Sequence, residues 1–210
     1  MDGSVDYSFN TNGIIGSTVL SLAMQSDGKI LVGGNYTNYS SVCQVARLNI
    51  NGSLDTSFFV SYNLAGGVHT ISIQSDGKIL IGGSMSQINN IRPINAFARL
   101  NLDGTIDNSF KTNTGIHHSG SPSIIIPQDN NKILVAGIFS SYDDVPCSYI
   151  TRLNMDGTVD NTFNISGGTN NGGITTVAVQ LDGKILIGGT FTRFNGNNGH
   201  NRICLLYTSD

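Results

Sequence analysis

Apolar and polar residues alternate along four short stretches of this chain, and the stretches recur about every fifty residues. In three of them a large apolar residue is followed by a small one, as in Leu22 and Ala23 or Ile71 and Ser72. Alternation with a period of two predicts a β-strand. The small residues on the second face predict that another sheet packs closely against it. The four predicted strands cover residues 19–25, 68–74, 122–128 and 174–180.

A tight turn and a second strand follow each of these stretches. Asp27-Gly28 and its copies supply the positive φ angles that a tight hairpin demands, whereas the third copy has Asn130-Asn131. The second strands end in paired glycines such as Gly33-Gly34, which predict a bulge or a close backbone approach. These strands cover residues 29–32, 78–81, 132–135 and 184–187.

A third strand and a second turn complete each unit. The third strands are predicted over 45–50, 97–102 and 150–155, and each ends at an Asp-Gly or Asn-Gly turn. The segment after this turn contains Asp-x-Ser/Thr-Phe, and it is either a short fourth strand or an ordered loop anchored by its aromatic ring. Its four copies end at Phe9, Phe58, Phe110 and Phe163.

The repeat predicts the architecture. One unit of about fifty residues cannot bury its apolar face alone, so neighbouring units must stack. Three or four antiparallel strands per unit fit one blade of a β-propeller better than one coil of a β-helix. We therefore expect an all-β, β-propeller-like array of about four blades, with units near 1–50, 51–102, 103–155 and 156–203.

Both ends of the chain depart from complete units. Met1 falls in the register of Ile50, and the fourth copy leaves the pattern after Ile203. Residues 204–210, from Cys204 to Asp210, match the translation of a transposon-end adapter of sequencing libraries, so we expect them to be a non-native tail. Offset ends can let a propeller complete one blade from both termini, but we expect an open fragment of a larger ring of up to about eight blades.

The composition agrees with an all-β chain and excludes several kinds of partner. Charged residues make up 12% of the chain, and it contains neither Glu nor Trp, so little is available for solvated helix faces. The net charge of -3 provides no basic surface for nucleic acid. No apolar run approaches the roughly 20 residues of a membrane helix, so we expect no membrane insertion, and no signal peptide is visible.

The combined motifs resemble the bacterial delta-60 repeat. They read Asp-Gly-x-x-Asp-x-Ser/Thr-Phe, then Gln-x-Asp-Gly-Lys-Ile-Leu-Ile/Val-Gly-Gly, then Arg-Leu-Asn, and they cover nearly the whole chain up to Ile203. The third unit departs from them at Pro127, Asn130-Asn131 and Ala136. The resemblance implies a propeller-like tandem array in an extracellular or cell-surface setting, and it implies no reaction.

The repeat also separates structural from catalytic residues, because a catalytic group is needed once per site and a structural one once per blade. Ten of the 14 acidic residues recur, and we predict that they form turns or charge-assisted hydrogen bonds between strands or blades. Calcium binding stays open as the alternative, although no unit has an Asp-x-Asp-x-Asp-Gly loop. The recurring residues are Asp2, Asp6, Asp27, Asp55, Asp76, Asp103, Asp107, Asp156, Asp160 and Asp182, with Lys29, Lys78, Lys132, Lys184, Arg47, Arg99, Arg152 and Arg202.

Few ionisable residues remain outside the repeat. Asp143-Asp144 could form half of a carboxylate site, but we expect a solvated loop tip. Cys43 and Cys147 lie two units apart, beyond the reach of a disulfide, and predict two thiols. We predict no catalytic, cofactor-binding or metal-binding residue and no cofactor. A metal site is the less favoured interpretation of the histidines, which are His69, His117, His118 and His200.

The favoured function is a non-enzymatic repeat module of a secreted or surface bacterial protein, acting as a scaffold or as a platform for an unknown protein or glycan. Variable loops carry function on a fixed frame. The alternative is a propeller enzyme, a hydrolase or lyase, in which Asp143, Asp144 or the histidines converge on the central channel. We expect one set of variable loops to lie together on one rim, and this set covers residues 36–42, 85–96, 140–147 and 191–201. We expect a second set to lie elsewhere, and it covers residues 11–18, 62–67, 112–121 and 166–173.

Overall fold

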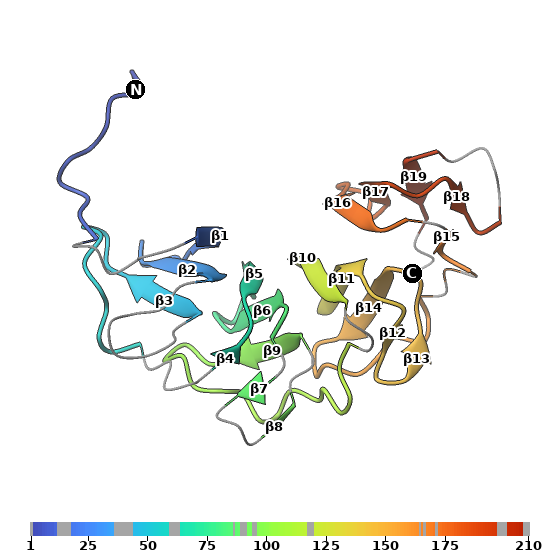
Figure 1. Cartoon of the computed structure of the whole chain (residues 1–210), viewed down its shortest axis with the longest axis horizontal. Coiled ribbons are helices and arrows are strands. Elements are labelled where there is room, and N and C mark those ends of the chain that lie inside the picture. Colours follow the sequence, from blue (N-terminus) through green and yellow to red (C-terminus); the bar gives the residue numbers. More distant parts are fainter. Residues whose placement is uncertain are drawn as a thin grey trace.

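Four large three-stranded antiparallel sheets follow one another along the chain and lie side by side in an open arc (Figure 1). The described residues contain strands and turns and no helix, which confirms the prediction of an all-β array of about four blades. The computed structural model describes residues 2–11, 18–35, 44–58, 64–85, 87–88, 92–93, 96–116, 120–163, 165, 167–170, 172–196 and 201–207.

Each blade is a meander in which the middle strand pairs with both neighbours. The first strand lies on the concave side of the arc and the third lies farther out (Figure 1). The first two blades are β1 (Thr18–Met24), β2 (Ile30–Asn35) and β3 (Val45–Leu48), then β5 (Val68–Ile73), β6 (Ile79–Gly83) and β9 (Phe97–Leu100). The last two are β10 (Ser121–Pro127), β11 (Lys132–Ile138) and β14 (Ile150–Asn154), then β16 (Ile174–Val179), β17 (Ile185–Gly189) and β19 (Ile203–Leu206).

The paired glycines let the backbones of the first two strands of a blade approach each other closely. A register shift opposite them marks a bulge in the first strand of every blade, for example between Val19 and Ser21. A Cβ atom on Gly83 would lie 2.1 Å from the carbonyl oxygen of Gly67. Both the predicted bulge and the predicted close backbone approach are therefore present.

The first turn of each blade is a three-residue hairpin loop. In the first blade the amide of Gln25 donates to the carbonyl of Lys29 at 2.8 Å, and Gly28, with a φ of 82°, donates back to Gln25 at 2.9 Å. The side chain of Asp27 accepts the Lys29 amide at 3.1 Å. In the third blade Asn131 adopts a φ of 60°, so it takes the place of the glycine.

The segment after the third strand is an anchored loop and not a full strand. It touches the sheet through a single bridge, Leu48 to Leu54 in the first blade, with copies in the second and third. The guanidinium of Arg47 lies 4.6 Å from the centroid of the Phe58 ring. This cation–π contact anchors the loop through its aromatic ring, which decides between the two alternatives that the sequence left open.

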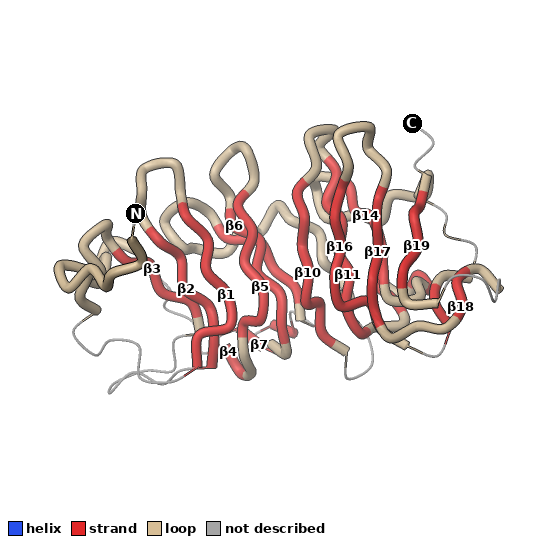
Figure 2. Tube along the Cα trace, turned by 90° about the horizontal axis from the view of Figure 1, so that it is seen from above, coloured by secondary structure: helices blue, strands red, loops and turns tan. Residues whose placement is uncertain are grey.

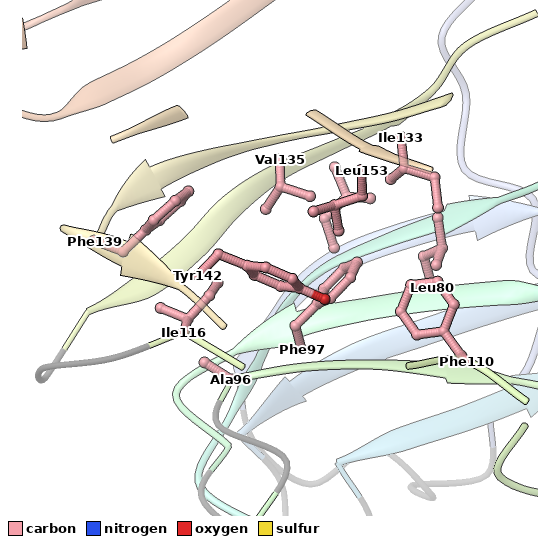
Figure 3. Close-up of a cluster of buried hydrophobic side chains, with 11 residues drawn as sticks. Leu80, Ala96, Phe97, Phe110, Ile116, Ile133, Val135, Phe139, Tyr142 and Leu153 are labelled. Atoms are coloured by element: carbon pink, nitrogen blue, oxygen red, sulfur yellow. The ribbon is translucent and has the colours of Figure 1, made fainter. Parts of the chain in front are cut away.

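The hydrophobic core lies between neighbouring blades. One cluster joins Leu31 of the first blade to Ile71 of the second. In the next cluster Phe97 of the second blade packs edge-on against Tyr142 of the third, with ring centroids 6.2 Å apart (Figure 3). Each blade therefore buries its apolar faces against its neighbours, which is how a stacked repeat is stabilised.

Small residues let adjacent sheets approach one another. The Ser72 hydroxyl on the second face of β5 donates to the Ile125 carbonyl of the next blade at 2.5 Å. A Cβ atom on Gly33 would lie 2.8 Å from Cδ1 of Ile71. In the third unit Ala136 takes the place of this glycine and is completely buried. The close packing predicted for the small second-face residues is confirmed.

The fourth blade corrects one sequence-based interpretation. β19 pairs with β17 so that Leu205 stands opposite Leu186, whereas Arg47 stands opposite Leu31 in the first blade. Arg202 lies directly before β19 with a φ of 68°, so it is not the fourth copy of Arg47. The preceding loop varies in length between units, and spacing along the sequence therefore could not set the register of this strand.

The segment expected to be a non-native tail takes part in this strand. Cys204 and Leu206 belong to β19 and are buried. Its origin stays a prediction, which the source nucleotides for Cys204 to Asp210 would test.

Candidate binding surface on the loop rim

The two sets of variable loops meet at one rim of the arc. In the fourth unit β15 (Thr169–Asn170) pairs with β18 (Arg193–Phe194). In the second, β4 (Leu64–Ala65) pairs with β7 (Gln87–Ile88), which also pairs with β8 (Arg92–Pro93). Figure 2 shows β4, β7 and β18 at the end of the blades opposite the hairpin loops that join first and second strands.

The expectation that the second loop set lies elsewhere is therefore wrong. The first two strands of a blade are antiparallel, so the loop entering the first and the loop leaving the second must lie at the same end. Residues 36–42 of the first set lie outside the described residues, as does most of the loop 11–18 of the second set. We call the surface formed by these two loop sets the loop rim.

A hairpin in the third unit is fastened to the opposite loop of the rim. It consists of β12 (Ser141–Tyr142) and β13 (Val145–Pro146), joined by Asp143 and Asp144 with φ angles of 46° and 64°, the geometry of a type I′ turn. Oδ1 of Asp143 accepts the amides of Thr114 and Gly115 at 3.0 and 2.7 Å. Asp143 therefore holds a loop of one set against a loop of the other.

This placement changes the interpretation of the two acidic residues. Asp143 is half-buried and hydrogen-bonded and is not a solvated tip, whereas Asp144 is exposed as predicted. β12 and β13 lie away from the concave side lined by β10 and β16 (Figure 1). Asp143 and Asp144 therefore do not lie on the concave side of the arc, where the enzyme alternative places them.

Of the four histidines, His69 lies within the described residues. His69 lies at the start of β5, as predicted, with Nε2 3.5 Å from the Ser84 hydroxyl. His117, His118 and His200 lie outside the described residues. Within the described ranges, no three His, Cys, Asp or Glu side chains lie close enough to one another to hold a metal ion.

A cavity of about 350 Å³ opens between the third and fourth units on the loop rim. Asp160 borders it, but this carboxylate is ion-paired with Nε of Arg152 at 2.7 Å. The cavity therefore presents apolar walls and neutral hydrogen-bonding groups. Other lining residues are Val145, Pro146, Cys147, Asn161, Phe163 and Ile165.

Cys147 supplies no reactive thiolate to this cavity. Burial raises the pKa of its thiol to about 12, so the group is neutral at physiological pH. The thiol is free, as predicted, while Cys43 lies outside the described residues. A ligand in this cavity would be held by shape complementarity and hydrogen bonds.

The recurring charges form an Arg–Asp–Lys cluster in each of the first three blades, in which the arginine and the aspartate are buried and the lysine is half-buried. In the second blade Oδ2 of Asp107 accepts Nε of Arg99 at 2.8 Å and Nζ of Lys78 at 2.6 Å. Arg99 also donates to the carbonyl of Met155 in the next blade. Burial opposes ionisation of Asp107, but hydrogen bonds from Lys78 and Ser109 hold its pKa well below the usual range.

The first, third and fourth blades show which of these charged residues have a structural role in every blade and which do not. The first and third blades repeat the cluster with Arg47, Asp55 and Lys29 and with Arg152, Asp160 and Lys132. In the fourth blade Leu205 replaces the arginine and Lys184 pairs with Asp182 of its own turn. All ten recurring aspartates accept a backbone amide two residues further on, so their predicted role as turn formers is confirmed.

The repeated sheets and clusters have a counterpart among known families. The family model described as domain of unknown function (DUF5122) beta-propeller matches residues 25–58, 74–110, 128–163 and 180–206. The chain belongs to this family. Each DUF5122 match begins at the first turn of a blade and runs through its third strand, and the first three matches end at the anchoring Phe.

Several solved structures are similar to this DUF5122 chain at low identity. The extracellular domain of a one component system from B. thetaiotaomicron is 13% identical with a TM-score of 0.47, covering 84% of this chain and 24% of that chain. A protein of unknown function from Bacteroides caccae is 17% identical with a TM-score of 0.44, covering 80% and 55%. Virginiamycin B lyase from Staphylococcus aureus is 13% identical with a TM-score of 0.42, covering 90% and 69%.

The DUF5122 chain thus spans about a quarter of the first of these structures. Among curated proteins none matches the sequence. In the part of the chain that the structure describes, no helix has the length and apolar character needed to cross a membrane.

Proposed function

We propose that this chain is a non-enzymatic repeat module of a secreted or surface bacterial protein, serving as a scaffold or as a platform for a protein or glycan. One observation carries the proposal: the recurring ionisable groups are engaged within the frame, while the variable loops gather on one rim. Loops presented by a rigid frame are where binding residues concentrate. The loop rim is therefore the binding surface of this proposal.

The cavity between the third and fourth units is a concave part of that surface. Val145 and Pro146 of β13 and Phe163 of the anchored loop provide apolar contact, and Asn161 provides an amide. A concave site with mainly apolar walls and a few polar groups suits a neutral ligand such as a sugar ring or a peptide segment. The only carboxylate among its lining residues, Asp160, is already paired.

The cellular location in this proposal rests on the resemblance of the repeats to the delta-60 family. The reading frame around this sequence tests it, because an extracellular module requires an export signal. A complete reading frame with no export signal would overturn the location and leave the binding role untouched.

A binding screen tests the platform role. The labelled chain is applied to glycan and peptide arrays, and each ligand found is titrated by calorimetry. Val145→Asp places a charge at the cavity mouth, where the side chain is 40% exposed, and is expected to weaken binding at least about tenfold.

Leu181→Asp serves as the control, because Leu181 is fully exposed in the hairpin loop of the fourth unit, at the end of the blades opposite the loop rim. It is expected to bind like the unaltered chain. Equal affinity of all three proteins would remove the cavity as the site, and arrays without any ligand would remove the platform role and leave the scaffold role.

A further inference from the structure

The cavity between the third and fourth units lies beside the counterparts of two aromatic rings that touch each other one unit earlier. Phe97 packs edge-on against Phe110, with ring centroids 5.6 Å apart. β14 pairs with β11 as β9 pairs with β6, and this register puts Ile150 at the position of Phe97. Phe163 ends the anchored loop of the third unit as Phe110 ends that of the second. Ile150 and Phe163 both line the cavity, so a smaller aliphatic side chain takes the place of one ring.

The ring of Phe163 stays partly accessible beside this cavity. Phe110 is 4% exposed, whereas Phe163 is half-buried. The guanidinium of Arg152 lies 5.0 Å from the centroid of the Phe163 ring and covers one of its faces. In the second unit the ring of Phe97 adds an edge-to-face contact, which is a favoured arrangement of aromatic pairs. Phe163 therefore presents an aromatic surface to the cavity that a second ring can pack against.

The size and the charge of the cavity suit an uncharged ring. Its volume of about 350 Å³ falls within the range of small-molecule sites, and a cavity of roughly 150 Å³ lined by aliphatic and aromatic residues is large enough for benzene. Asp160 is paired with Arg152, and burial raises the pKa of Cys147 so that its thiol is neutral. The aliphatic and aromatic lining residues are Val145, Pro146, Ile150, Val159, Phe163 and Ile165, all inside the repeated part of the chain.

A sugar ring fits these walls less well than a benzene ring. Each hydroxyl group that a sugar buries needs a hydrogen-bonding partner, and burying one without a partner costs free energy. A benzene ring has no such requirement, and it is stabilised by burial of its apolar surface and by contact with Phe163. Asn161 is an exposed lining residue whose side-chain amide can bond to a peptide group. These groups favour an aromatic residue within a peptide chain over a sugar.

We propose that the cavity binds the phenylalanine side chain of a peptide segment in a partner protein, with its ring packed edge-on against Phe163 as Phe97 packs against Phe110. This inference rests on the proposed function, in which the loop rim is the binding surface. The occupant follows from continuity with the preceding interface, where the chain makes the same contact with a residue of its own. Ile150 then determines specificity, because a phenylalanine at this position closes the site from within.

Chemical-shift changes in methyl NMR spectra of the 210-residue chain test the proposal. The probe is N-acetylphenylalanine amide, and the comparison ligands are N-acetylalanine amide and methyl glucoside. The phenylalanine amide should give saturable shifts at the methyl groups of Val145, Ile150 and Ile165, and the other two ligands should give none there. Ile81 is completely buried in the core between the first and second blades and serves as the internal reference that should not shift.

Two substitutions and a control place the site. Ile150→Phe should weaken binding of the phenylalanine amide at least about tenfold, with the fold confirmed by circular dichroism. Val145→Asp at the cavity mouth should also weaken it, and this variant keeps the test valid if Ile150→Phe does not fold. Leu181→Phe is the matched control, because it adds the same ring at a fully exposed position outside the cavity lining. It should bind like the unaltered chain.

The possible failures separate this inference from the proposed function. Shifts with methyl glucoside that equal or exceed those with the phenylalanine amide would overturn the inference and leave a glycan-binding platform. Binding of the phenylalanine amide that survives both substitutions would overturn the placement of the site. Spectra that stay unchanged with all three ligands would also overturn the inference, and the array screen then decides the platform role by itself.

Discussion

Nε of Arg99 lies 2.8 Å from Oδ2 of Asp107, and both side chains are more than nine-tenths buried. The pair closes the anchored loop of the second blade onto its third strand. Since the same arginine donates to the carbonyl of Met155 in the following blade, this contact also links one unit to the next. Breaking a buried pair leaves an uncompensated charge, which is far more costly than losing a solvated one.

We expect Arg99→Met to lower the free energy of unfolding by about 3–5 kcal/mol, because Asp107 then stays buried without its guanidinium partner. Urea denaturation followed by circular dichroism measures the change. The control is Lys111→Met, which breaks an exposed pair with Asp156 at 3.1 Å and should cost about 0–1 kcal/mol. Equal midpoints for the two variants would contradict the role of the buried pair.

Stability should fall in acid because of the lowered carboxyl pKa values. Although burial opposes ionisation, the hydrogen bond from Thr162 helps lower the pKa of Asp160 to about 2, and Asp55 and Asp107 are also shifted downward. A carboxyl with a folded-state pKa below its unfolded value of about 3.9 stabilises the fold above that value. The stabilisation is lost as the pH falls toward about 2.

Urea denaturation at a series of pH values between about 6 and 2 measures this loss. Asp107→Asn should be less stable at neutral pH and should show a shallower pH dependence, because one titrating group has been removed. An unfolding free energy that stays constant down to pH 2 would contradict the interpretation.

The two glycines that end β6 should differ in their tolerance of a methyl group. A Cβ atom on Gly83 would meet the Gly67 backbone, so Gly83→Ala should cost about 3 kcal/mol or more. On Gly82 it would meet side-chain atoms of Pro122 and Ile125 instead of backbone, and Ala136 already occupies this position in the third unit. Gly82→Ala should therefore cost only about 1 kcal/mol, and the opposite ranking of melting temperatures would contradict the packing argument.

Asp143→Ala should loosen the loop rim without weakening the blades. Two backbone amides lose a charged acceptor, a loss of about 1.5–3 kcal/mol locally for each. Hydrogen exchange should become faster at Thr114 and Gly115 and stay unchanged in β11. Asp144→Ala serves as the comparison because it keeps these amide bonds, and identical exchange in the two variants would refute the fastening role.

The thiol of Cys147 should react slowly in the folded protein. Its raised pKa of about 12 leaves almost no thiolate at pH 8, and burial limits access. Iodoacetamide labelling read by peptide mass spectrometry should be slow in buffer and fast in urea. Rapid labelling of the folded chain would show that the cavity exposes the sulfur.

Local interactions explain what the sequence could predict. Asp27 and Gly28 define a turn through bonds within a few residues, and the same is true of Asp55 and Ser57, so one stretch of chain carries all the information needed. Strand alternation and the buried role of small residues followed from the same repeated pattern. The pairing of both loop sets on one rim also follows from antiparallel topology, although the sequence-based expectation missed it.

The sequence by itself determined the repeat, its turns, its strands and the structural role of its recurring aspartates, because these depend on neighbours in the chain. Tertiary structure decided that Leu205 replaces the cluster arginine in the fourth blade and that Asp143 binds the loop at Thr114, 29 residues away. Those outcomes depend on loops of variable length and on stacking between blades, and neither is encoded within one repeat.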